Sequence, residues 1–215
     1  MTSSSPYRRA LVAGTFVFAS VAASFAIAAE EKAPPPAASK PSKTPDVVYV
    51  PTPQPVVDKM LELAEVKAGD VVYDLGCGDG RIVVTAAKKF GVKAIGYDID
   101  PQRVKEAREN VRKAGVEHLV RIEEADVFTL DLTGASVITL YLLPALNVRL
   151  MPQLAKLKPG SRIVSHNFDM RGAKPVSTTP VQIPPGEAEN AFFEEDGVHT
   201  VYKWVVPWEA EKPSN

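Results

Sequence analysis

Seven residues, Asp74 to Gly80, hold three glycines at alternate positions between an apolar strand pattern and a helical one. Glycine lets the backbone turn tightly, and it lets a ligand approach where a Cβ would collide. At the carboxyl edge of a parallel sheet, such a loop is where nucleotide-like ligands bind. Asp98 ends the next expected strand, where a carboxylate can accept hydrogen bonds from both hydroxyls of a ribose. The loop and this acid together predict a ligand that contains a nucleoside.

The charges around the loop favour S-adenosylmethionine over a dinucleotide. A dinucleotide fingerprint has the spacing G-x-G-x-x-G and directs a helix N-terminus at a pyrophosphate. Here the spacing is G-x-G-x-G, and Asp79 inside the loop would repel a phosphate. Asp74, just before the first glycine, would attract the ammonium of an aminoacyl group. S-adenosylmethionine carries an ammonium and a sulfonium but no phosphate, so it is the expected cofactor.

Methyl transfer from a sulfonium needs a neutral nucleophile held close to the methyl group in a site that excludes water. Residues that could assist must come from the ends of strands around the donor. We expect the catalytic residues among Tyr141, His166 and Asn167, which end the fourth and fifth expected strands. For Tyr141 and His166 the alternative is a structural role in the core. Tyr49, Thr52 and Pro144 are further candidates for the substrate pocket or a lid.

The elements that must position these residues alternate between strand and helix from Val47 onward. Expected strands are residues 71–75, 93–98, 119–123, 136–142 and 161–165, and expected helices start near Thr52 and cover 81–90, 101–114 and a segment to Lys158 that Pro152 should kink or restart. This order is typical of an α/β domain with a doubly wound, mostly parallel sheet covered by helices on both faces. Near the end, residues 191–194 and 198–206 flank Asp196-Gly197, which predicts an antiparallel hairpin.

The N-terminal segment resembles a secretory signal peptide. Arg8 and Arg9 precede an uncharged run to Ala29, and Ala26-Ile27-Ala28 provides the small residues of a cleavage site after Ala28. The alternative is an uncleaved anchor, because the run is long enough to span a bilayer. The two arginines also resemble those of signals for the export of folded proteins, although they could simply supply the positive charge of an ordinary signal. We therefore expect an exported, periplasmic domain or one anchored to the inner membrane.

Composition bounds the remaining organisation. Residues 29–46 hold five prolines and no large apolar side chain, so they should form a disordered linker. The folded domain is expected at 47–208, with a flexible tail at 209–215. Without residues 1–28, 23 basic residues face 26 acidic ones, which gives no electrostatic basis for binding nucleic acid. The lone Cys77 excludes an intrachain disulfide, and no metal site is expected.

The chain from Val47 to about Pro207 resembles the class I S-adenosylmethionine-dependent methyltransferases, whose single domain has a seven-stranded sheet with a C-terminal antiparallel hairpin. The resemblance implies that Asp98 holds the ribose and that Ile99 packs on the adenine. Asp126 in "EEADVF" would bind the adenine amino group, with Val127 beside the ring. It further implies that the methionine part of the donor contacts Asp74, Gly76, Gly78 and Gly80.

A narrower resemblance is to the protein-lysine methyltransferases that modify the ATP synthase c-subunit and the adenine nucleotide translocase. It rests on "YVPTP", "DLGCGDGRIV", "LYLLP" and "MPQLAKLKPGSRIVSHNF". That family tends to carry serine where this chain has Cys77, which we interpret as a packing residue. The resemblance implies methylation of a lysine side chain in a protein, for which a membrane protein is one option. Two alternatives are a non-catalytic module that binds S-adenosylmethionine and a methyltransferase acting on a small molecule or lipid.

Overall fold

The computed structural model describes residues 48–183 and 197–211 of the 215-residue chain. Strands and helices alternate as expected over most of this length. The strands that precede residue 170 are β1 (Val71–Leu75), β2 (Lys93–Asp98), β3 (Val120–Glu124), β4 (Val137–Leu140) and β5 (Arg162–His166). The helices are α1 (Gln54–Leu63), α2 (Arg81–Phe90), α3 (Pro101–Ala114) and α4 (Pro144–Leu154), with a 3-10 turn η1 (Val127–Thr129).

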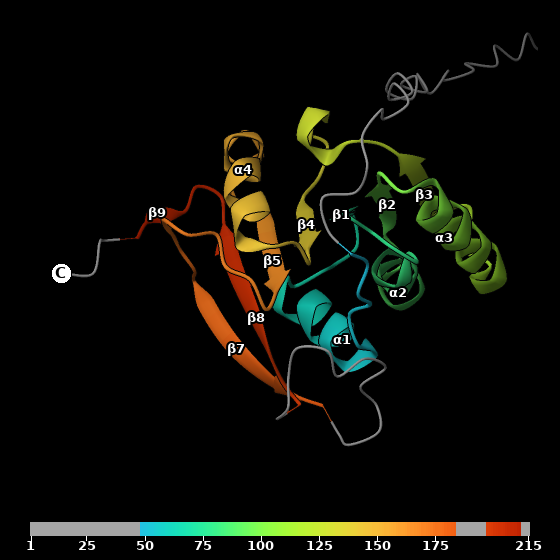
Figure 1. Cartoon of the computed structure of the whole chain (residues 1–215), viewed down its shortest axis with the longest axis horizontal. Coiled ribbons are helices and arrows are strands. Elements are labelled where there is room, and N and C mark those ends of the chain that lie inside the picture. Colours follow the sequence, from blue (N-terminus) through green and yellow to red (C-terminus); the bar gives the residue numbers. More distant parts are fainter. Residues whose placement is uncertain (1–47, 184–196, 212–215) are drawn as a thin grey trace, which may run out of the picture. The chain divides into compact units, whose positions relative to one another are not determined.

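A seven-stranded sheet in the order β3-β2-β1-β4-β5-β8-β7 forms the centre of the described region (Figure 1). β1 to β5 pair in parallel, and β8 (Val198–Val205) runs antiparallel to both β5 and β7 (Ser177–Gln182). Because the chain order reverses between β1 and β4, a crevice opens at the carboxyl ends of these strands, where such sheets bind ligands. This arrangement confirms the predicted class I methyltransferase fold.

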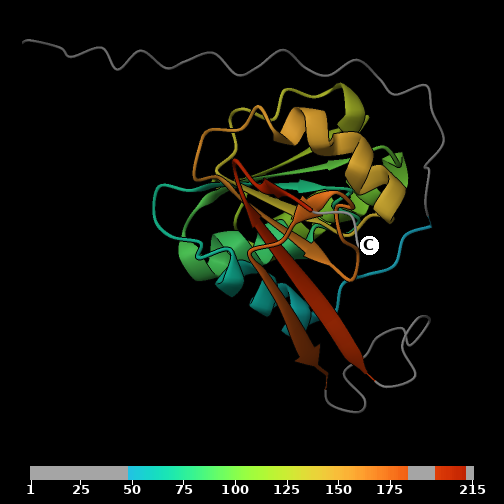
Figure 2. The same cartoon turned by 90° about the vertical axis from the view of Figure 1, so that its left-hand side faces the viewer.

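Helices cover both faces of the sheet (Figure 2). α1, α2 and α3 pack on one face, where Met60, Val83 and Val104 belong to one buried cluster. α4 covers the other face, where Leu150 and Trp204 belong to a second buried cluster. The sheet therefore packs between two buried cores.

Capping residues explain why the helices between the first strands begin and end as predicted. The Asp100 side chain accepts a hydrogen bond from the Gln102 N–H at the start of α3, and Pro101 is the first residue of that helix. Gly91 and Gly115 end α2 and α3 in the left-handed conformation. By contrast, α4 contains Pro152 and ends two residues later, before the predicted end at Lys158.

The predicted C-terminal antiparallel hairpin is confirmed, but its first strand lies earlier in the chain than expected. The antiparallel partner of β8 is β7, which the sequence does not predict because Pro180 and three hydroxyl residues hide its strand pattern. Both edges of β8 are occupied, by β5 and β7, and the predicted partner at residues 191–194 lies outside the described residues. β9 (Glu209–Ala210) pairs with β6 (Ala173–Lys174), so ordered pairing continues past the boundary expected at residue 208.

The predictions for the N-terminus, a signal segment at 1–28 and a linker at 29–46, lie outside the described residues. Among the helices that are described, none combines the length and the apolar character needed to cross a bilayer.

Candidate functional site

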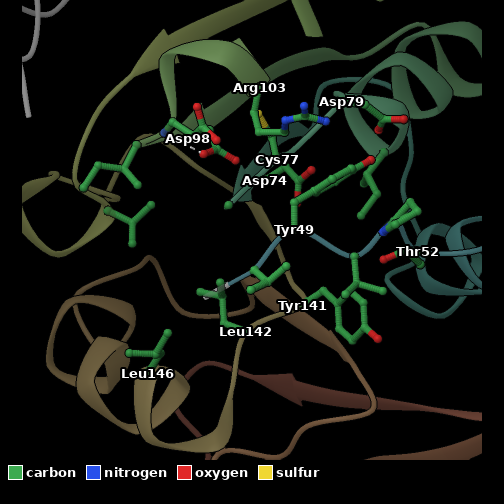
Figure 3. Close-up of a pocket in the computed structure, with 18 of the residues that line it drawn as sticks. Tyr49, Thr52, Asp74, Cys77, Asp79, Asp98, Arg103, Tyr141, Leu142 and Leu146 are labelled. Atoms are coloured by element: carbon green, nitrogen blue, oxygen red, sulfur yellow. Dashed lines mark hydrogen bonds between the residues drawn. The ribbon is translucent and has the colours of Figure 1, made fainter. Parts of the chain in front are cut away.

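A cavity of about 520 Å³ lies at the carboxyl ends of β1, β2 and β4 (Figure 3). Its walls come from the segment before α1, the glycine loop, the ends of β2 and β4, the turn before η1 and the start of α4. The lining residues are Val48 to Thr52, Asp74, Gly76, Cys77, Asp79, Arg81, Ile82, Asp98 to Asp100, Arg103, Ala125 to Phe128, Tyr141, Leu142 and Leu146. The cavity is therefore lined by most of the cofactor-binding residues that the sequence predicts.

Asp74 places a buried carboxylate at the cavity wall. One oxygen accepts a hydrogen bond of 2.7 Å from the Thr139 hydroxyl, whereas Oδ2 has no partner within the described residues. Burial, reinforced by the negative charges of Asp98 and Asp79, raises the pKa of Asp74 to about 7, although the Thr139 hydrogen bond opposes the shift. A buried oxygen without a partner is costly, and the ammonium of an aminoacyl ligand would relieve this cost. The residues present therefore fit the methionine part of the expected cofactor.

We expect the affinity for S-adenosylmethionine to rise with pH between about pH 5 and pH 7. Because the pKa of Asp74 is raised in the folded protein, its carboxyl group keeps a proton up to about pH 7 when no ligand is bound. The unfolded chain loses this proton at a lower pH, so the contribution of Asp74 to the free energy of unfolding falls as the pH rises toward 7. Below pH 7, Asp74 must lose that proton before it can pair with the ammonium of the donor. This requirement lowers the affinity by up to about tenfold for each pH unit below 7. Calorimetric titration of the full chain at several pH values measures this slope.

Asp74→Asn should flatten the pH dependence of binding, because an amide has no proton to lose. Asp126→Asn is the matched control, since it also removes a carboxylate at the cavity but should leave the slope in place. An unchanged slope in Asp74→Asn would assign the pH dependence to another group.

Asp98 is positioned by two backbone N–H groups at the end of β2. Its oxygens accept hydrogen bonds of 2.8 Å from Gly78 N–H and 2.9 Å from Asp100 N–H. Burial raises the pKa of Asp98, and these backbone hydrogen bonds oppose the shift. Each carboxylate oxygen can accept a further hydrogen bond, so Asp98 can bind ribose hydroxyls while it fixes the glycine loop. Asp126 similarly accepts a hydrogen bond of 3.0 Å from Phe128 N–H.

The segment Val48–Thr52, here called the strap, crosses the glycine loop and supplies one wall of the cavity. The hydroxyl of Tyr49 hydrogen-bonds to Asp79, and the Arg103 guanidinium lies 4.9 Å from the centre of the Tyr49 ring. Burial and the negative Asp79 raise the pKa of Tyr49, so its phenol stays neutral. Arg81 joins strap and loop, because it pairs with Asp79 and donates a 3.0 Å hydrogen bond to the Thr52 carbonyl. Tyr49 therefore lies over the glycine loop and lines the cavity, and its role as a lid stays a prediction.

Two of the predicted glycines do not line the cavity. Gly78 has φ +53°, and a Cβ built there would lie 2.1 Å from Cε2 of Tyr49, so the tyrosine ring covers it. At Gly80, with φ +80°, a Cβ would lie 3.1 Å from Cβ of Ala107 in α3. Gly80 therefore allows α3 to pack close to the loop. Because Gly80 does not line the cavity, this geometry gives no support for a contact between Gly80 and the donor. Asp74, Gly76, Asp98, Ile99, Asp126 and Val127 do line the cavity.

The catalytic candidates occupy three different environments. Tyr141 lines the cavity, and its ring packs against the His166 ring at a centroid distance of 3.9 Å, with the two planes tilted by 33°. His166 is fully buried behind it. Asn167 does not line the cavity; its backbone N–H and its side-chain oxygen bond to Thr200 at 2.7 and 2.8 Å, which ties the end of β5 to β8.

Pro144, another pocket candidate, begins α4 and is not among the lining residues. The nearby apolar wall comes from Leu142 and Leu146 instead. Sequence reasoning missed both leucines and also Arg103 and Phe128. For the leucines a signal existed, because they follow the fourth strand within and just after "LYLLP". Among the described residues, no cluster of histidine, cysteine or acidic side chains is arranged to hold a metal ion.

Cys77 lines the cavity and is 5% exposed. Burial, together with the negative charges of Asp74, Asp98 and Asp79, raises the pKa of its thiol. A thiol in such surroundings stays protonated and is a poor nucleophile. The environment agrees with the interpretation of Cys77 as a packing residue.

Comparisons with known proteins agree with this geometry. The sequence profile of the ANTKMT methyltransferase domain matches residues 74–177. A protein-lysine N-methyltransferase of Saccharolobus islandicus is 46% identical over 169 residues, which cover 77% of this chain and 97% of that protein. The adenine nucleotide translocase lysine N-methyltransferase of Mus musculus is 34% identical over 61% of this chain, and the match spans 57% of the mouse protein.

Among solved structures, an RNA methyltransferase of Salinibacter ruber in complex with S-adenosyl-L-homocysteine is similar to this chain. It is 46% identical, with a TM-score of 0.64, and the match covers 77% of this chain and 98% of that chain. The S-adenosyl-L-homocysteine in that structure agrees with the ligand that Asp74 and Asp98 predict for this chain. The two relatives at 46% identity carry different acceptor names, so the acceptor has to be argued from the site and tested.

Proposed function

The chain belongs to the class I S-adenosylmethionine-dependent methyltransferases, in the family of protein-lysine methyltransferases that contains the ANTKMT domain, and we propose that it methylates a lysine side chain of a protein. One observation of the molecule carries the donor-binding part of the proposal. Asp74 presents an unpartnered oxygen at the wall of a cavity that Asp98 also lines. This pair of acids matches a ligand with an ammonium at one end and a ribose at the other.

The chain's own residues divide the work of donor binding. S-adenosylmethionine supplies a methyl group on a positively charged sulfur when it is bound. Asp74 would pair with its ammonium, and Asp98 with its ribose hydroxyls. Ile99, Asp126 and Val127 would hold the adenine, while the strap residue Tyr49 would help to exclude water. Exclusion of water matters because a cationic donor is best held by fixed protein dipoles in a dry site.

Lysine is the acceptor that the protein relatives and the charge balance support together. The relatives from Saccharolobus islandicus and Mus musculus are both named as lysine methyltransferases. A chain with 25 basic and 26 acidic residues lacks the basic excess that RNA binding needs. The RNA named for the Salinibacter ruber structure therefore becomes the alternative outcome of the test.

Incubation of the full chain with tritium-labelled S-adenosylmethionine and a bacterial membrane extract tests the proposal. We expect label that protease releases and ribonuclease does not, and fragmentation mass spectrometry should place the methyl group on a lysine nitrogen. Label on RNA, a carboxyl group or a lipid would contradict lysine methylation but leave the donor chemistry intact. Binding of the donor without any transfer would favour a non-catalytic binding module.

We further propose that the domain acts outside the cytoplasm. The support is the sequence before residue 29, with its two arginines, uncharged run and Ala26-Ile27-Ala28 site. Fractionation of a C-terminally tagged full chain tests this, and we expect the tag outside the inner membrane. Changing Arg8 and Arg9 to lysine together should stop export through the route for folded proteins and leave the ordinary route unaffected. Uncut protein that is soluble in the cytosol would contradict the proposal.

A further inference from the structure

A chain of hydrogen-bonded side chains begins at the cavity wall and leads into the core. Thr52 Oγ1 lies 3.2 Å from His166 Nδ1, and His166 Nε2 lies 2.8 Å from His199 Nδ1. The three residues come from the strap, the end of β5 and β8. All three are buried, with exposed fractions of 4%, 0% and 8%. Buried polar groups joined across three separate elements fix one another's orientation.

Thr52 and Tyr141 both line the cavity. Figure 3 shows both on the side of the cavity away from Asp98. With the ribose held at Asp98 and the ammonium at Asp74, the side near Thr52 and Tyr141 remains for the incoming nucleophile. Thr52 is the residue there with a hydroxyl that is also hydrogen-bonded to a buried histidine.

His166 is a neutral imidazole in this setting. Burial, with a smaller contribution from His199, lowers the pKa of His166 to about 3. A neutral imidazole has one N–H donor and one nitrogen acceptor. If Nε2 carries the hydrogen and donates to His199, Nδ1 accepts the hydroxyl hydrogen of Thr52. The lone pairs of the Thr52 oxygen are then available to the cavity.

We propose that the Thr52 oxygen accepts a hydrogen bond from the neutral amine of the substrate lysine and that His166 and His199 are positioning residues which orient the Thr52 hydroxyl. This inference rests on the proposed lysine acceptor. A neutral amine has two N–H donors and one lone pair, and it needs the lone pair for attack on the methyl group. Holding one N–H at a fixed oxygen points the lone pair in one direction, and such orientation contributes much of the rate in enzymes. The Tyr141 ring packs against that of His166 at a centroid distance of 3.9 Å and so restricts the imidazole.

Two substitutions at Thr52 separate the hydroxyl from the shape of the side chain. Thr52→Val keeps the shape and removes the hydroxyl, and its rate at saturating extract should fall by about 100-fold. Thr52→Ser keeps the hydroxyl and should lose only about threefold, because its rotamer is less restricted. The rate is the initial incorporation of tritium into protein of the membrane extract by the full chain. The half-saturating extract concentration and the calorimetric affinity for S-adenosylmethionine should stay within about twofold in both variants.

The positioning role of His166 has its own pair of variants. Asn places a polar atom close to the position of Nδ1, so His166→Asn should retain more of the rate than His166→Leu. If His166 had a purely structural role, the methylation rates of both variants would fall in step with their thermal stability. Nitrogen-15 NMR of the full chain gives a reading that does not depend on turnover. The chain has three histidines, and His118→Gln removes the exposed one from the spectrum.

We expect the His166 signals to show hydrogen on Nε2 and a lone pair on Nδ1. Hydrogen on Nδ1 would overturn the inference, because Thr52 would then be the acceptor of that bond. Equal rates for Thr52→Val and Thr52→Ser would also overturn the inference. If the wild-type chain labels lysine in the same extract, the proposed function would still stand. An extract in which the wild-type chain labels no lysine would contradict the proposed function, and this inference with it.

Discussion

Gly78→Val is expected to weaken the binding of S-adenosylmethionine by more than about 100-fold, since each 1.4 kcal/mol of cost is tenfold in affinity. Gly78 has φ +53°, a conformation that a β-branched residue adopts only with strain. A Cβ there would also lie 2.1 Å from the Tyr49 ring, so the strap would have to move off the loop. Calorimetry of the full chain measures the loss.

Gly91→Ala is the matched control for strain without a collision. Gly91 has φ +64°, and a Cβ at this position would meet no heavy atom within 4 Å, so this variant should lose stability but keep its affinity for the donor. Cys77→Ser should also bind nearly as well as the wild type, because it exchanges one small side chain for another. If Cys77→Ser were more damaging than Gly78→Val, the interpretation of the cysteine as a packing residue would be wrong.

Asp98→Ala is expected to cost about 1.5–3 kcal/mol of donor binding, which is the usual value of hydrogen bonds to a charged group. The variant removes the expected acceptor for the ribose and also the acceptor for Gly78 N–H and Asp100 N–H. The loss should therefore affect S-adenosylmethionine and S-adenosylhomocysteine equally, because both carry the ribose. Asp131→Ala, at a carboxylate that does not line the cavity, should leave binding unchanged. NAD should bind neither the wild type nor Asp98→Ala. If the wild type bound NAD and not S-adenosylmethionine, the assignment of the glycine loop to S-adenosylmethionine would be contradicted.

Local signals in the sequence are sufficient for the first half of the fold. β1, α2, β2 and α3 begin and end at the predicted residues, because glycines and an Asp-Pro pair mark their ends with backbone conformations that few other residues favour. β7 escapes prediction because Ser177 to Gln182 is polar and contains Pro180. Its strand character comes from pairing with β8, which is a contact across the intervening chain and leaves little trace in the local pattern.

The cofactor site is predictable to the extent that it depends on strand ends. Asp74 and Asp98 both lie at the ends of strands, so their convergence follows from parallel pairing. The contact between Tyr49 and Gly78 could not be read from the sequence, because it depends on the path of the strap across the loop. The pairing of His166 with His199 similarly depends on the register of β8 against β5. A shift of one residue would turn His199 to the opposite face of the sheet.

The close approach of Gly80 to Ala107 has a consequence for how this family can diverge. A glycine with φ +80° cannot easily be exchanged, so the size of residue 107 is limited by a neighbour that cannot vary. A larger residue at 107 would push α3 away from the loop, and α3 carries the Arg103 that lies over Tyr49. Among diverging relatives, an increase in volume at position 107 should therefore be accompanied by loss of the arginine–tyrosine pair. A substitution at this one buried alanine would therefore weaken the contact of α3 with the strap, even if no residue that lines the cavity had changed.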